Sequence, residues 1–391
     1  MIHLAQRMSR LGTETAFEVL AKARALEAKG KDIVHLEIGE PDFDTPGNIR
    51  TAAKKAIDDG FTHYGPAAGL PPARAAIAKD AAQARGIEVT PDQVVITPGA
   101  KPIMYFTITA CIDEGDEVIY PNPGFPIYES VIEFVGGKPV PIHLKEEHDF
   151  RFTIEDLKRL ITKKTRMLIL NSPQNPTGGI LTEGDLREIA KLAMERNLTV
   201  LSDEIYSRTL YDGQKHFSIS AIPGMRERTV ILDGFSKTYA MTGWRLGFGI
   251  FPLELAPLIT QLQINCTSCT ASFSQMAAIE ALTGPQREAE KMVEEFKRRR
   301  DVIVDGLNSI DGIRCKKPLG AFYVFPNITG TGMKSRELAE YLLNEAGVAC
   351  LSGTAFGKFG EGYLRFSYAN SIPNIEKALD RVRKALARKN R

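Results

Sequence analysis

Four short apolar runs recur in the first part of the chain, and each leads directly into a segment rich in turn residues. The runs cover residues 93–97, 117–120, 165–170 and 199–202. Helical spacing follows at 102–111 and 182–196. Strands that alternate with helical segments are typical of a mostly parallel sheet flanked by helices. Ligands bind outside the carboxyl ends of such strands, so the pattern predicts an α/β fold whose strand-end loops share one crevice.

The length of the chain predicts two domains, because 391 residues exceed an ordinary single core. After Gly284 and Pro285, a charged segment without glycine before Gly306 predicts a long connecting helix. The part that follows mixes the two element types, with strands at 322–325 and 363–368 and helices at 335–345 and 375–387. We therefore predict a large domain over 48–284 and a smaller α+β domain formed by 1–47 and 285–391, with the connector at 285–309.

Composition excludes several classes of protein. The net charge of +2 gives no basic excess that would indicate nucleic-acid binding. No segment approaches the ~20 apolar residues of a membrane span, and the N-terminus lacks the apolar core of a secretory signal. Five cysteines are few for this length and indicate reduced thiols in the cytoplasm. Cys266 and Cys269 have no second pair beside them, so we expect no metal site.

The segment 236–245 holds a lysine in a setting that favours chemistry. An apolar run at 229–232 leads into it and another at 246–250 follows it, so Lys237 lies on a turn at the end of a strand. Partial burial there would lower the pKa of the amine, and a neutral amine can form a Schiff base with a carbonyl. Arg245 returns a fixed cation to the same edge. The alternative is an ordinary surface lysine.

The loops after the other strands carry complementary groups. Gly99 precedes a helix, where free N–H groups can hold a phosphate. Phe125 could stack on a flat ring or pack in the core. Asn175 lies in a turn-rich loop, while Asp203 ends a central strand, where a carboxylate calls for a cationic partner, and Tyr206 follows it. Together with the lysine, these groups suit a flat, phosphorylated, electron-withdrawing ring.

Three further residues qualify for the same crevice. Gly39 precedes an acid and a proline in a loop where the backbone can approach a ligand, although a plain turn explains it as well. Tyr64 begins a loop rich in glycine and proline. Arg365 lies in a strand among apolar and aromatic residues, where a half-buried guanidinium needs an anion. That anion is either a ligand or a carboxylate of the protein itself.

At this point the chain resembles the aspartate aminotransferase family of fold-type I enzymes, which depend on pyridoxal 5′-phosphate. Four segments carry the resemblance in the expected order, at 175–178, 203–206, 236–247 and 364–368. The resemblance covers nearly the whole length, from Gly39 to Arg365.

The resemblance implies a role for each candidate residue. Lys237 would hold the cofactor and move the α-proton, and Asp203 would pair with the ring nitrogen so that the ring draws electrons. Tyr206 and Asn175 would bind the ring oxygen, and Phe125 would stack on the ring. The phosphate would be held by Gly99, Ala100, Lys101, Ser236 and Arg245, with Tyr64 reaching the site of a neighbouring subunit. Arg365, helped by Gly39 and Asn175, would bind the substrate α-carboxylate.

The resemblance also implies a homodimer with shared active sites and a transfer of amino groups between an L-amino acid and a 2-oxoacid. Lys101 favours aspartate or glutamate as the amino donor and 2-oxoglutarate as acceptor, because a cation there would attract a second carboxylate. The alternative is a neutral or aromatic donor such as alanine, phenylalanine or tyrosine, which Phe17 and Ile38 would suit. A lyase or synthase on the same scaffold is a third hypothesis. A DNA-binding regulator is disfavoured, since only residues 1–38 precede Gly39.

Overall fold

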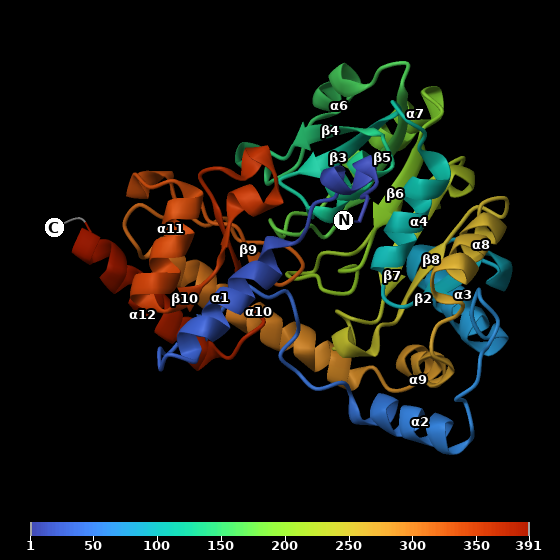
Figure 1. The fold of residues 1–391 in the computed structure, drawn as a ribbon, viewed down its shortest axis with the longest axis horizontal. Helices are drawn as coiled ribbons and strands as arrows, with labels where there is room; N and C mark the ends of the chain where they lie inside the picture. Colours follow the sequence, from blue (N-terminus) through green and yellow to red (C-terminus); the bar gives the residue numbers. More distant parts are fainter. Residues whose placement is uncertain (1, 390–391) are drawn as a thin grey trace.

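A seven-stranded sheet forms the centre of the computed structural model, which describes residues 2–389 (Figure 1). Its strand order is β2-β8-β7-β6-β5-β3-β4. The strands are β2 (Val94–Thr97), β3 (Glu117–Asn122), β4 (Lys138–His143), β5 (Thr165–Asn171), β6 (Thr199–Asp203), β7 (Thr229–Gly234) and β8 (Gly247–Ile250). Only β8 runs against its neighbours β2 and β7. The carboxyl ends of the other strands therefore lie along one edge of the sheet.

Burial on both faces explains the apolar runs of the sequence. Strands β2, β3, β6 and β7 are buried over most of their length, as expected where helices cover both faces of a sheet. The helices of this part of the chain are α2 (Gly47–Asp58), α3 (Pro71–Arg85), α4 (Lys101–Cys111), α5 (Ile127–Phe134), α6 (Ile154–Leu160), α7 (Glu183–Glu195), α8 (Ala256–Thr267) and α9 (Ser272–Thr283). The Thr182 side chain caps α7 and forms a capping box with Asp185.

The long helix α10 (Arg287–Asn308) leads away from the sheet to a second group of elements (Figure 1). There β11 (Leu351–Ser352), β12 (Leu364–Ser367) and β9 (Tyr323–Val324) form an antiparallel sheet in that order. The N-terminal β1 (Val34–His35) pairs in parallel with β10 (Val348–Ala349), which joins an N-terminal segment to the C-terminal group of elements. The remaining helices are α1 (Thr15–Glu27), α11 (Ser335–Tyr341) and α12 (Ile372–Lys389). The α/β fold class is confirmed. The domain boundaries stay a proposal: a large domain over 48–284 and a smaller one formed by 1–47 and 285–391.

Several elements differ from the sequence-based expectation: α6, α8, α9, β10 and β11 were not predicted, and three others are as follows. Strand β4 was not predicted, because its Pro139 and Pro141 cannot donate to a ladder; the strand is tolerated because it forms the edge of the sheet. Helix α5 was also not predicted. The helix expected over 335–345 ends as an α-helix at Tyr341 and continues as a π-turn over Leu342–Ala346. Within residues 2–389, no helix has both the length and the apolar composition needed to cross a bilayer.

Candidate active site

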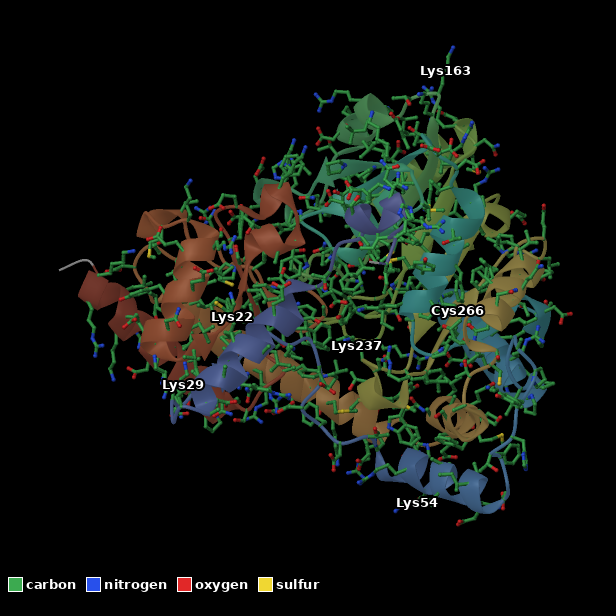
Figure 2. All side chains as sticks on the ribbon, in the orientation of Figure 1. Lys22, Lys29, Lys54, Lys163, Lys237 and Cys266 are labelled. Atoms are coloured by element: carbon green, nitrogen blue, oxygen red, sulfur yellow. The ribbon has the colours of Figure 1, made fainter. Side chains whose placement is uncertain are left out.

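A cavity of about 590 Å³ opens at the carboxyl edge of the central sheet. The loops after β2, β3, β5, β6 and β7 contribute to its wall, and so do strands β9 and β12. Eleven of the thirteen residues predicted from the sequence line it: Gly39, Ala100, Lys101, Phe125, Asn175, Asp203, Tyr206, Ser236, Lys237, Arg245 and Arg365. Figure 2 shows Lys237 between the central sheet and the C-terminal group of elements.

The amine of Lys237 contacts the N-terminal segment that contains Gly39. Its Nζ donates to the carbonyl oxygen of Gly39 at 2.6 Å, and lies 5.8 Å from the centre of the Phe322 ring. Burial lowers the pKa of the Lys237 amine to about 8, and the charge of Arg365 acts in the same direction. About a tenth of this amine is therefore neutral at pH 7, far more than for a lysine with an ordinary pKa, and a nucleophile or a proton acceptor must be neutral.

Asp203 is a buried carboxylate with a hydrogen bond that orients it. The Tyr128 hydroxyl donates to Asp203 Oδ2 at 2.5 Å, and the Ile205 N–H donates to Oδ1 at 3.2 Å. Burial raises the pKa of Asp203 to about 6, while these two hydrogen bonds act against the rise. Above that pH the site holds an anion with no cation of the protein bound to it in the described residues, which suits a cationic nitrogen of a ligand.

The amide of Asn175 and the phenol of Tyr206 reach the cavity from neighbouring loops. Asn171, at the end of β5, accepts the backbone N–H of Asn175 at 3.0 Å and donates to the carbonyl of Asp203 at 3.2 Å. It thereby fixes both loops relative to each other. The Tyr206 hydroxyl shares a 2.7 Å hydrogen bond with that of Tyr323. Two polar groups that can bind a ring oxygen thus lie on the same side of the cavity.

A close approach of backbone and guanidinium forms the end of the cavity at α4. Gly99 has a φ of 87°, which favours glycine, and a Cβ there would collide with the guanidinium of Arg245. A Cβ at Gly247 would collide with the backbone nitrogen of Ala100. Helix α4 begins here, so its free N–H groups and the positive end of its dipole point outward beside Arg245. This arrangement suits a dianionic phosphate, and Ser236 lines the same cavity.

Arg365 meets the cavity from β12. Its guanidinium lies between the rings of Tyr323 and Phe356, at 4.6 and 5.1 Å from their centres. Its Nη1 donates to Asn175 Oδ1 at 3.4 Å and its Nη2 to the carbonyl of Glu37. Its Nε is buried with no partner within residues 2–389, and no carboxylate there forms an ion pair with it. The sequence left open whether the anion that pairs with Arg365 is a ligand or a carboxylate of the protein. This arrangement favours a ligand.

Lys101 and Phe125 occupy the outer part of the cavity. Lys101 Nζ lies 5.5 Å from the centre of the Phe125 ring and donates to the carboxylate of Glu14. Phe125 packs edge-on against Tyr128, with ring centres 5.6 Å apart. Phe125 is half-buried: it packs against the core and also lines the cavity. Phe17 and Ile38 line the same region.

Two predicted residues do not line the cavity. Gly99 lies one residue outside it, next to Ala100. Tyr64 is 91% exposed and contributes nothing to this cavity of its own chain. The roles of all thirteen residues stay predictions.

Sequence reasoning missed three residues that the structure places at the site: Tyr128, Tyr323 and Glu14. Tyr128 lies three positions after Phe125, a helical spacing that would have indicated it had α5 been predicted. Tyr323 lay within a predicted strand, but nothing in the sequence indicated that it faces Tyr206, 117 residues earlier. Glu14 gave no signal, because it reaches Lys101 only through the fold.

Comparison with known proteins agrees with this geometry. The sequence model of the family described as "Aminotransferase class I and II" matches residues 31–382. An aspartate aminotransferase of Pyrococcus abyssi is 45% identical over 362 residues, which cover 92% of this chain and 93% of that protein. An aromatic-amino-acid aminotransferase of Thermococcus litoralis is 43% identical over 360 residues, covering 91% and 92%.

Solved structures give the same result. The aspartate aminotransferase from Thermus thermophilus with maleate superposes with a TM-score of 0.94 at 37% identity, over 98% of this chain and 100% of that one. Members of the family use pyridoxal phosphate and act on amino acids and oxoacids. The family match over most of the length, with the lysine, carboxylate and arginine around one cavity, shows that this chain belongs to the class I and II aminotransferases and is a transaminase.

Proposed function

We propose that this transaminase binds pyridoxal 5′-phosphate in the cavity and works through Lys237. The observation that carries the proposal is a lysine amine with a pKa lowered to about 8 that lines one cavity with the buried Asp203. The phosphate would be held at the start of α4 by Gly99, Ala100 and Arg245. When bound, the cofactor supplies the electron sink that accepts the charge left when the substrate loses its α-proton.

The protein's own residues divide the remaining work. The Lys237 Nζ accepts the α-proton and returns it, which its lowered pKa permits near neutral pH. Asp203 presents an anion at the depth of the cavity, oriented by Tyr128. Arg365 binds the substrate α-carboxylate through its guanidinium, which lines the cavity, and so fixes the α-carbon relative to Lys237.

Treatment of the purified protein with borohydride tests the cofactor assignment. We expect the protein to be yellow and to lose its visible band, because reduction fixes the bond between cofactor and lysine. Mass spectrometry of the digest should then place the adduct on Lys237. The exposed Lys54, on α2, serves as the reference lysine in the same digest (Figure 2). An adduct on another lysine, or none after reconstitution with cofactor, contradicts the proposal.

We also propose a homodimer whose subunits complete each other's sites. Tyr64 supports this, since it is 91% exposed and lines no part of its own chain's cavity. Leu258 and Ile264 on α8 are further large apolar side chains that are more than half exposed, at 52% and 55%. A monomer at micromolar concentration in sedimentation velocity contradicts the homodimer. The five free cysteines support a reducing, cytoplasmic location.

For the substrate we propose a dicarboxylic amino acid, aspartate or glutamate, with 2-oxoglutarate as acceptor. The support is Lys101, a half-exposed ammonium that lines the cavity, together with the aspartate aminotransferases among the relatives. The competing candidate is an aromatic or neutral amino acid. Phe17, Ile38 and Phe125 on the cavity wall favour it, as does the aromatic-amino-acid aminotransferase relative.

Replacing Lys101 with alanine separates the two substrate classes. We expect the transition-state stabilisation for aspartate, calculated from kcat/KM, to fall by about 2–3 kcal/mol, as for a lost contact to a charged group. The value for alanine or phenylalanine should change little. Steady-state assays with all three donors and 2-oxoglutarate measure this ratio. An equal loss for every donor shows that Lys101 serves the phosphate end, and the dicarboxylic assignment then fails.

A further inference from the structure

Glu14 stands at the start of α1 but interacts with the cavity rather than with its own helix. It occupies the N-cap position, yet its side chain accepts no hydrogen bond from the first turn. The carboxylate instead accepts from Lys101 Nζ, 87 residues further along the chain. The Glu14 side chain is only 17% exposed, whereas that of Lys101 is 48% exposed. Glu14 is therefore the more buried partner of an ion pair that lines the cavity.

The other carboxylates on the cavity wall have partners of their own, so Glu14 is the one that pairs with Lys101. Glu14 lies close enough to Lys237 and Arg365 for its charge to raise the pKa of both. The other glutamate on the wall, Glu40, accepts a hydrogen bond from Thr242. Asp203 is bound by Tyr128. Glu14 is thus a carboxylate of the protein at the position where the distal carboxylate of a dicarboxylic substrate would arrive.

We propose that Glu14 determines the substrate range by occupying Lys101 in place of a substrate's distal carboxylate. The inference rests on the proposed function, in which Lys101 faces the distal end of the substrate. With a neutral or aromatic donor, Glu14 stays on Lys101, so the apolar side chain does not desolvate an unpaired ammonium. A dicarboxylic donor displaces Glu14, because two carboxylates that share one ammonium repel each other.

Displacement costs little because of where Glu14 stands. The released carboxylate lies at the N-terminus of the 13-residue helix α1, at the positive end of the helix dipole. Lys101 can therefore serve both classes of donor, at the expense of some affinity for dicarboxylates. Glu14 thus discriminates between donors by competing with, and repelling, the distal carboxylate of a dicarboxylic donor.

The variant Glu14→Gln tests the inference in the cofactor-loaded enzyme. We expect the Kd of maleate, a dicarboxylate, to fall about fivefold, the upper range for a partly exposed ion pair. The Kd of 3-phenylpropanoate, an apolar monocarboxylate, should rise about threefold, since Lys101 then lacks its anion. Isothermal titration calorimetry measures both. In assays, the ratio of kcat/KM for aspartate to that for phenylalanine should rise about tenfold.

Two variants provide matched controls. Glu18→Gln makes the same charge change on the exposed side of the same helix, outside the cavity, and should leave both Kd values unchanged. Glu14→Asp keeps the charge and should retain most of the wild-type ratio. In a Lys101→Ala background, Glu14→Gln should no longer discriminate between the two ligands, because the competition requires the ammonium.

Several results would overturn the inference. They are an unchanged maleate-to-phenylpropanoate ratio in Glu14→Gln, an equal change in Glu18→Gln, or the same change without Lys101. These outcomes are distinct from a failure of the proposed function. That failure appears as the absence of a cofactor adduct on Lys237, or as a Lys101→Ala variant that treats all donors alike, whereas the inference alone fails when Lys101 matters for aspartate and Glu14 does not.

Discussion

Replacing Asp203 with alanine is expected to lower kcat by at least about a thousandfold, in line with removal of a main electrostatic stabiliser. The Asp203 carboxylate is buried and lines the cavity. Without it, nothing holds a proton on the ring nitrogen, and the negative charge at the substrate α-carbon loses its stabilisation. The cofactor itself should stay bound, since the residues proposed to hold its phosphate, Gly99, Ala100 and Arg245, and the proposed attachment point Lys237 are unchanged.

Single-turnover kinetics and the cofactor content of the purified variant measure this effect separately. The variant Tyr128→Phe is the matched control, because it removes only the hydrogen bond at 2.5 Å. We expect a loss of about tenfold there, as for a hydrogen bond to a charged group. That bond lowers the pKa of Asp203, so its removal should move the acid limb of the rate profile to higher pH. Near-normal turnover of Asp203→Ala contradicts the assigned role.

The change Arg365→Leu is expected to lower kcat/KM for every amino acid by a few hundredfold to a few thousandfold. This corresponds to a loss of about 3–5 kcal/mol of transition-state stabilisation. The guanidinium is buried between two rings with its Nε unpartnered, so it stands ready for a bidentate bond to a carboxylate. Its loss leaves the α-carboxylate of any donor buried without a counter-charge. Because all donors share this group, the loss should not depend on the side chain.

Arg365→Lys tests whether charge alone suffices. It keeps the cation but not the planar fork, and should recover only part of the activity. Calorimetric titration with maleate measures binding independently of turnover, and the bound cofactor, followed by its visible band, should be retained in both variants. A loss confined to dicarboxylic donors would place Arg365 at the distal end of the substrate and exchange its role with that of Lys101.

Much of the fold followed from local patterns. The runs at 165–170 and 199–202 are strands β5 and β6, which extend one residue further, to Asn171 and Asp203. Such strands are readable because burial on both faces demands unbroken apolar residues. Strand β4 escaped prediction since its prolines are allowed only at an edge, and the position of a strand within a sheet is not a local property.

The sequence by itself determined the chemical groups of the site: a lysine, a carboxylate, an amide and an arginine at the ends of predicted strands, which the sheet brings to one edge. Only the tertiary structure decided their surroundings. Tyr323 reaches Tyr206 from 117 residues away, and Glu14 reaches Lys101 from 87. Such partners are chosen by the packing of the N- and C-terminal segments against the central sheet. That packing depends on long-range burial, which leaves no periodic signal along the chain, and it sets both the pKa of Lys237 and the counter-charge of Lys101.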